Sequence, residues 1–132
     1  MATKFVADDW GKLILRVTVG GLLLMHGIAK LINGVDPVMG LLADKGLPGV
    51  IAYGVYIGEV LAPLFMIIGF YARAAAVVVV LNMCAAIYLA HSRDLLALSE
   101  HGSWKVESPM FFLLAALAVA LLGTGQIAVK KS

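Results

Sequence analysis

The sequence is poor in charge and almost free of cysteine. Only 14% of its 132 residues are charged, where a typical soluble domain has about 25%, and 62% are hydrophobic. A soluble protein of this size has too much surface to cover with so few charges. The single Cys84 excludes a disulfide scaffold, and ten basic residues against eight acidic ones provide no cationic face for nucleic acid. The composition therefore indicates an integral membrane protein.

Most of the hydrophobic residues fall in four long runs. The runs cover residues 13–32, 50–71, 74–90 and 110–129, close to the length of about 20 that a bilayer-spanning helix needs. An open strand in lipid leaves backbone groups without hydrogen bonds, so each run is expected to be a helix. The first run is too long for the core of a cleaved signal peptide, and its end lacks a small-x-small cleavage pattern. We therefore predict a single all-α domain over residues 1–132, an integral membrane four-helix bundle.

The connections differ in character. Residues 33–49 are expected to form a polar loop with a short apolar patch. In the longest connection, residues 91–109, three leucines at 95, 96 and 98 predict a short helix on the bilayer surface. Four spans place both termini on one side, where six basic residues lie near helix ends against four on the other side. The positive-inside rule then favours cytoplasmic termini.

Glu59 is the only acidic residue within a predicted span. It lies about 13 Å deep at about 1.5 Å per residue, where a charge costs about 3 kcal/mol. We expect it to face the bundle interior and to be either protonated or paired. It is a structural carboxyl or a proton-handling or ligand-binding acid, and its depth favours the second interpretation. Pro63 removes the hydrogen bond normally donated to the carbonyl of Glu59, so a kink and a small polar cavity are expected there.

Other polar residues are expected near this acid. His26 and Lys30 are four residues apart, hence on one face of the first helix. His26 is expected within one helical turn of the depth of Glu59, close enough for a direct or water-bridged contact. Lys30 either joins the site or anchors the helix by snorkelling. Asn82, level with Glu59, either joins the site or supplies an interhelical hydrogen bond. Arg16 is expected to be a snorkelling anchor at the opposite end of the helix.

A polar lip is predicted above the bundle, around the last loop. Its members are His91, His101, Trp104 and Glu107. No H-x-x-x-H or E-x-x-H spacing supports a metal site, so no metal is predicted. Cys84 has no C-x-x-C partner, and it is expected to be a packed core residue rather than part of a redox pair.

A series of short motifs runs in order along nearly the whole chain. They are HGIAKL at 26–31, GLP at 46–48, GEVLAPL at 58–64, GFYAR at 69–73, AIYLAH at 86–91, GSWKVE at 102–107 and GTG at 123–125. Taken together, the ordered set resembles the DoxX family of small four-helix bacterial membrane proteins. That family often ends with Ser-x-Asp after the last Gly-x-Gly, where this chain has Gln126-Ile127-Ala128.

The resemblance implies a protein of the bacterial plasma (inner) membrane that is linked to redox metabolism. Some members of the family are subunits of a thiosulfate:quinone oxidoreductase, and others associate with enzymes of oxidative-stress defence and sulfur transfer. Matched residue by residue, the family pattern implies functional polar positions at Lys30, Glu59, His91, Trp104 and Glu107.

Our first hypothesis is a redox-linked accessory subunit that binds a quinone or another small molecule within the bundle. The predicted ligand-binding residues are Glu59, His26, Lys30, Asn82, His91, Trp104 and Glu107. The chain has no haem-ligand spacing, flavin motif or cysteine pair, so electrons would come from a redox enzyme partner or a bound cofactor. An accessory subunit is therefore expected rather than a self-sufficient oxidoreductase. Besides the lipid bilayer and this partner, self-association into a homo-oligomer stays open.

Two other classes of function are retained. In a non-catalytic scaffold or assembly protein, the buried polar groups would only hold the helices together. A small transporter or proton pathway is less favoured, because four short helices leave little room for alternating access.

Overall fold

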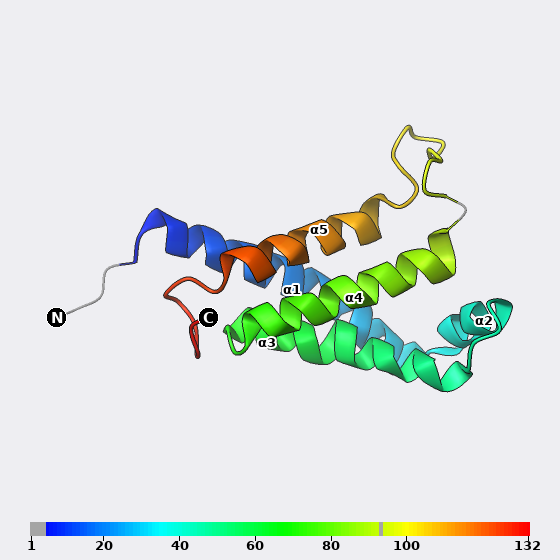
Figure 1. The fold of residues 1–132 in the computed structure, drawn as a ribbon, viewed down its shortest axis with the longest axis horizontal. Coiled ribbons are helices and arrows are strands. Elements are labelled where there is room, and N and C mark those ends of the chain that lie inside the picture. Colours follow the sequence, from blue (N-terminus) through cyan, green and yellow to red (C-terminus); the bar gives the residue numbers. More distant parts are fainter. Residues whose placement is uncertain (1–4, 93) are drawn as a thin grey trace.

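The computed structural model describes residues 5–92 and 94–132, and its regular structure is helical (Figure 1). In chain order the elements are α1 Ala7–Asn33, α2 Asp36–Asp44, the 3₁₀ helix η1 Gly49–Gly54, the π-helical turn η2 Ile57–Leu61, α3 Ala62–Ile68, α4 Ala72–His91 and α5 Glu107–Leu122. The C-terminus and the start of α1 lie at one end of the bundle, and α2 lies at the other (Figure 1). The predicted all-α membrane bundle is confirmed.

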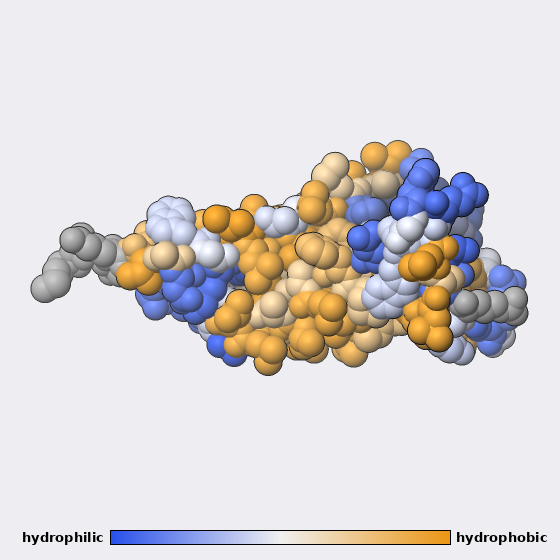
Figure 2. Space-filling model, turned by 90° about the horizontal axis from the view of Figure 1, so that it is seen from above, coloured by the Kyte–Doolittle hydropathy of each residue, from blue (hydrophilic) through white to orange (hydrophobic). Residues whose placement is uncertain are grey.

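Within the described residues, three stretches are long and apolar enough to cross a membrane: Ala7–Asn33, Gly49–Ile68 and Ala72–Ala90. The second of these combines η1, η2 and α3 and is called the second span below. α5 is also apolar but has only 16 residues, about 24 Å at about 1.5 Å per residue. Figure 2 agrees with these spans, because the middle of the surface is largely hydrophobic and the two ends are more hydrophilic.

Two helices end earlier than predicted because a glycine follows them. α3 ends at Ile68, where Gly69 takes a left-handed conformation with φ of +73°. α5 ends at Leu122 instead of residue 129, and Gly123 has φ of +80°. The apolar residues beyond this glycine therefore do not continue the fourth helix.

The C-terminal segment, residues 123–132, folds back onto the bundle instead. The amide of Val129 donates to the carbonyl of Ile68 at 3.1 Å. The amide of Gln126 donates to the buried carboxylate of Asp9 at 3.0 Å. The segment is thus tied to the end of the second span and to the start of α1.

Arg16 is buried, and the prediction that it anchors α1 by snorkelling is wrong. Its exposed fraction is 0%. Its Nη1 donates to the carbonyls of Met66 at 2.9 Å and Ile67 at 3.3 Å, and its Nη2 donates to the carbonyl of Ile127. The last carbonyls of a helix lack intrahelical partners, and the helix dipole favours a cation beside them. Arg16 therefore joins α1 to the end of α3 and to the C-terminal segment.

The predicted interfacial helix in the last loop is wrong. Residues 94–106 form turns, with an isolated bridge between Leu98 and Trp104. The amide of Ser99 donates to the carbonyl of Ser103 at 2.6 Å, and Gly102 supplies the positive φ of +82° that closes the turn. Because this polar turn begins at Ser99, directly after the leucines, too few residues remain there to form a helix.

The first connection, expected to be a loop, contains α2. Asp36 lies in the first turn and Pro37 at one of the first two helical positions, where its missing N–H costs nothing. The buried Leu42 of α2 packs with Val35 and Ala52. The short apolar patch of this connection therefore covers the start of the second span.

The main core lies between α1, α3, α4 and α5. Its buried side chains include Val19, Leu23, Met66, Val79 and Val119. Cys84 is exposed on α4, so the prediction of a packed core cysteine is wrong. The helix is apolar all round, and position 84 faces away from its neighbours.

α1 packs closely on the second span because two of its glycines have no side chain. A Cβ at Gly20 would lie 2.8 Å from the carbonyl oxygen of Pro63, and one at Gly27 would overlap the carbonyl oxygen of Glu59. Gly21 has nothing within 4 Å and plays no part in this contact. Small residues at helix crossings allow such close approach in membrane proteins.

Candidate functional site

Glu59 forms an ion pair with Lys30 inside the bundle. Glu59 is 3% exposed, in the middle of the second span, and Lys30 lies three residues before the end of α1. The Lys30 Nζ donates to Oε1 at 2.6 Å and to Oε2 at 2.8 Å. The acid is therefore paired, and its partner is Lys30 rather than the expected His26.

Asn82 on α4 supplies a third hydrogen bond. Its Nδ2 donates to Oε2 of Glu59 at 3.1 Å. A Cβ at Gly58 would lie 2.6 Å from the Cβ of Asn82, so the glycine before the acid is what lets α4 approach. The carboxylate thus receives donors from two helices on either side of its own.

The backbone around Glu59 is a π-helical turn. The amide of Ala62 donates to the carbonyl of Ile57, five residues back. Pro63 has no N–H to donate to the carbonyl of Glu59, and this carbonyl lies against Gly27 of α1. π-helical turns occur mostly as single turns within α-helices, often at functional sites. The local sequence therefore turns the acid toward both neighbouring helices.

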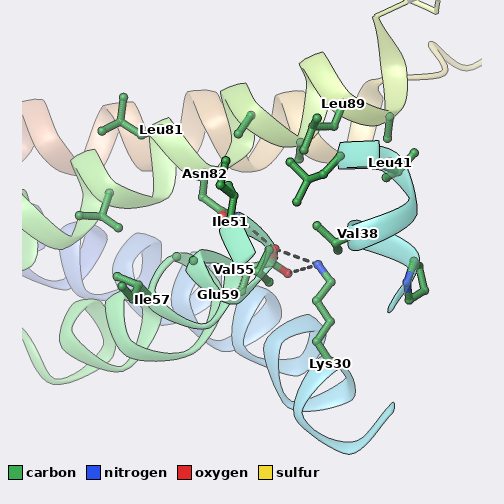
Figure 3. Close-up of a pocket in the computed structure, with 18 residues that line it drawn as sticks. Lys30, Val38, Leu41, Ile51, Val55, Ile57, Glu59, Leu81, Asn82 and Leu89 are labelled. Atoms are coloured by element: carbon green, nitrogen blue, oxygen red, sulfur yellow. Dashed lines mark hydrogen bonds and ion pairs between the residues drawn. The ribbon is translucent and has the colours of Figure 1, made fainter. Parts of the chain in front are cut away.

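A cavity of about 550 Å³, the first cavity, lies beside the ion pair. Its apolar lining includes Val38, Leu41, Ile51, Val55, Leu81 and Leu89 (Figure 3). The polar side chains in the lining are those of Lys30, Glu59 and Asn82, which converge at one side of the cavity (Figure 3). An apolar chamber with a few convergent polar groups is the usual form of a small-molecule site.

The first cavity reaches the outer surface of the spanning helices. Ile57 of the second span and Leu81 of α4 line it, and they are 55% and 64% exposed. Both residues lie in stretches that are apolar enough to cross a membrane. The cavity therefore opens at the apolar outer surface of the bundle.

A second cavity of about 210 Å³ lies on another side of the same ion pair. It is lined by Leu23, His26, Lys30, Glu59, Met83, Ala86, Ser108, Pro109 and Phe112. The His26 ring packs edge to face on Phe112, with 5.8 Å between centroids. His26 thus reaches the predicted site by lining this cavity.

The predicted lip residues lie farther out. Trp104 donates from its indole Nε1 to the carbonyl of Leu95 at 2.7 Å, within the last loop. His101 and Glu107 are exposed, and neither lines the first or the second cavity. His91 ends α4, and its side chain lies outside the described part of the structure.

Two contributions to the site do not follow from the sequence analysis. α2 supplies Val38 and Leu41 to the wall of the first cavity, and the Asp36-Pro37 pair was the available signal for a helix start. The hydroxyl of Tyr56 donates to the carbonyl of Lys30 at 3.2 Å, which holds the end of α1 against the second span. Among the described side chains, no group of three or more His, Cys, Asp or Glu is placed to hold a metal ion.

Comparison with known families gives one match. Residues 11–92, more than half of the chain, match the DoxX family model, and this region includes Lys30, Glu59 and Asn82. No curated protein and no solved structure matches the chain.

Proposed function

This chain belongs to the DoxX family of membrane proteins, and we propose that it is a redox-linked accessory subunit that binds a quinone or a similar amphipathic molecule in the first cavity. The observation that carries the proposal is the shape and chemistry of this cavity. It is about 550 Å³, it opens at the apolar outer surface of the bundle, and Lys30, Glu59 and Asn82 converge at one side. Binding pockets for small molecules are typically about 300–1,000 Å³.

The polar groups divide the work of binding. The ammonium of Lys30 is placed to donate to a carbonyl oxygen of the ligand while it stays paired with Glu59. Asn82 donates its hydrogen bond to Glu59. The ring of the ligand and the start of its tail would therefore contact the apolar walls of the cavity. The tail would leave through the mouth between Ile57 and Leu81.

The chain supplies no electron carrier of its own. It has a single cysteine, Cys84, which is exposed on α4. We therefore propose that a partner enzyme of the bacterial plasma membrane delivers or takes the electrons, with the termini of this chain in the cytoplasm. A role linked to oxidative stress would follow from the chemistry of that partner.

A structural role is the second candidate, and one observation favours it. Glu59 receives three hydrogen bonds from the protein itself, so the triad is satisfied without a ligand. In that case the chain is a scaffold, and Lys30 and Asn82 act as links between helices.

The test is to fill the first cavity without touching the triad. Ala85 lines the cavity, and Ala74 lies on the same helix, is exposed and lines neither cavity. We expect Ala85→Phe to weaken binding of a short-tailed ubiquinone analogue at least about ten-fold in lipid nanodiscs, which corresponds to about 1.4 kcal/mol. Ala74→Phe serves as the matched control. If wild type binds no quinone, or if both variants bind like wild type, the accessory-subunit proposal fails and the scaffold interpretation stands.

A further inference from the structure

The Lys30–Glu59 ion pair lies between two cavities with different surroundings. Both residues line the first cavity and the second cavity. The first cavity lies between the second span and α4 and opens at the apolar outer surface of the bundle. The second lies between α1, α4 and α5, and it is lined by residues near the end of α1 and the start of α5. One pair of charges is thus accessible from two directions.

The second cavity reaches the first turn of α5. Ser108, the second residue of α5, lines it and is exposed. His26 lines it one helical turn deeper than Lys30 and is also exposed. The cavity therefore joins the start of α5 to the ion pair, and its lining carries His26 and Ser108 beside the pair.

His26 is the histidine that lines this cavity. Within the described part of the chain, its ring nitrogens have no hydrogen-bond partner from the protein, and Phe112 supports the ring from one side. Histidine is the side chain best suited to exchange protons with water near neutral pH. His26 therefore places an imidazole between the start of α5 and the ion pair.

Among the described residues that line the two cavities, the titratable side chains are few. α1 contributes His26 and Lys30 to the two cavities, and the second span contributes Glu59. The lining residues from α2, α4 and α5 carry no titratable side chain. A proton that reaches the pair through the second cavity thus has His26 as its one titratable stop among the lining residues.

We propose that the second cavity is an aqueous proton route to Lys30 and Glu59, with His26 as the relay. The ligand reaches the pair from lipid, and protons reach it from water by a separate path. When the Lys30 ammonium gives a proton to a ligand oxygen, its neutral amine takes one from the His26 imidazolium through water. His26 then takes a proton from the aqueous side, and no electron moves in these steps. The delivery of protons to a bound ligand rests on the proposed function, whereas the access of water to the ion pair does not.

The route can be tested without any ligand, by the accessibility of introduced thiols. In a Cys84→Ala background, His26→Cys and Ser108→Cys place a thiol in the second cavity, and Ala85→Cys places one at the first cavity. The native Cys84, exposed on α4, is the lipid-facing control. In lipid nanodiscs we expect a charged methanethiosulfonate reagent to label the second-cavity thiols at least about ten-fold faster than Ala85→Cys or Cys84. Equal rates at all these positions would overturn the aqueous route.

The relay has its own measurement. Time-resolved infrared spectroscopy after release of a caged proton follows the carboxylate bands of Glu59, assigned with Glu59→Gln. We expect His26→Gln to slow their response at least about ten-fold. An unchanged rate, or no response in wild type, would overturn the relay. Rapid labelling and a slowed response in a protein that binds no quinone would leave the route in place and reject only the proposed function.

Discussion

The Nζ of Lys30 donates to both carboxylate oxygens of Glu59, at 2.6 and 2.8 Å, and so ties α1 to the middle of the second span. The two partners are not equally buried. The side chain of Glu59 is 5% exposed and that of Lys30 is 33% exposed. A lysine at this depth keeps its long apolar stem among the helices and retains a path to the interface. Glu59 has no such path, so the loss of either partner has different consequences.

We expect Lys30→Met to destabilise the protein more than Glu59→Gln. Lys30→Met leaves a buried carboxylate without a cation, which costs about 3 kcal/mol. Glu59→Gln leaves a lysine that extends to water, and its cost is about 1 kcal/mol. The free energy of unfolding in detergent micelles measures both, and the double variant gives a coupling energy of at least about 1 kcal/mol. Strictly additive effects would show that the pair adds nothing to stability.

Gly27→Ala is expected to damage the same crossing through packing. The new Cβ would overlap the carbonyl oxygen of Glu59, so α1 must move away and the ion pair must lengthen. Overpacking of this kind costs about 1–3 kcal/mol. Gly21→Ala, next to no other group within 4 Å, is the matched control and is expected to stay within about 0.5 kcal/mol of wild type. Thermal unfolding of both variants decides the point, and equal midpoints would contradict the close packing.

The sequence was sufficient to predict the membrane bundle and to identify Glu59 as its interior acid. Both follow from the cost of charge in lipid, which depends on composition and depth alone. The identity of the partner does not follow from depth. The ammonium of a lysine one turn from a helix end can lie either at the interface or beside a buried acid. Here α1 packs closely on the second span at Gly27, and this packing brings Lys30 to Glu59.

The misjudged elements share a physical cause. Arg16 was assigned to the surface because its partners are backbone carbonyls, and no sequence pattern marks them. Another of its acceptors, the carbonyl of Ile127, lies beyond Gly123, in a segment that hydropathy alone predicts to be helical. Long-range tertiary hydrogen bonds of this kind override local hydrophobicity, and they appear only when the chain is folded.

Arg16→Met is expected to loosen the end of the bundle that carries the start of α1 and the C-terminal segment. It removes the donors for the carbonyls of Met66 and Ile67 and keeps an unbranched apolar stem in the same place. Buried acceptors left without a partner cost about 1–3 kcal/mol each, so we expect a loss of about 3 kcal/mol. Limited proteolysis should then cut the C-terminal segment faster than in wild type.

Lys12→Met is the control for this change. Lys12 lies one turn earlier in α1 and pairs with the exposed Asp8 at 2.7 Å. Exposed pairs contribute about 0–1 kcal/mol, so this variant should retain the protection of the C-terminal segment. If Lys12→Met loosened the segment as much as Arg16→Met, loss of positive charge rather than loss of the buried hydrogen bonds would be responsible.

Asn82→Asp is expected to make stability depend on pH. The side chain of Asn82 donates to Glu59 Oε2 at 3.1 Å, so an aspartate there would place a second carboxylate against the first. Two adjacent carboxylates cannot both ionise in a buried site without strong repulsion. At neutral pH the variant should therefore be less stable than wild type by about 2 kcal/mol or more. Below the pH at which one of the two takes up a proton, the protonated acid again donates a hydrogen bond and the difference should shrink.

Asn82→Leu removes the donor without adding charge, so its cost of about 1 kcal/mol should stay constant over the same range. Unfolding measured from pH 4 to pH 8 for both variants tests this, and a flat profile for Asn82→Asp would place residue 82 too far from Glu59 to interact.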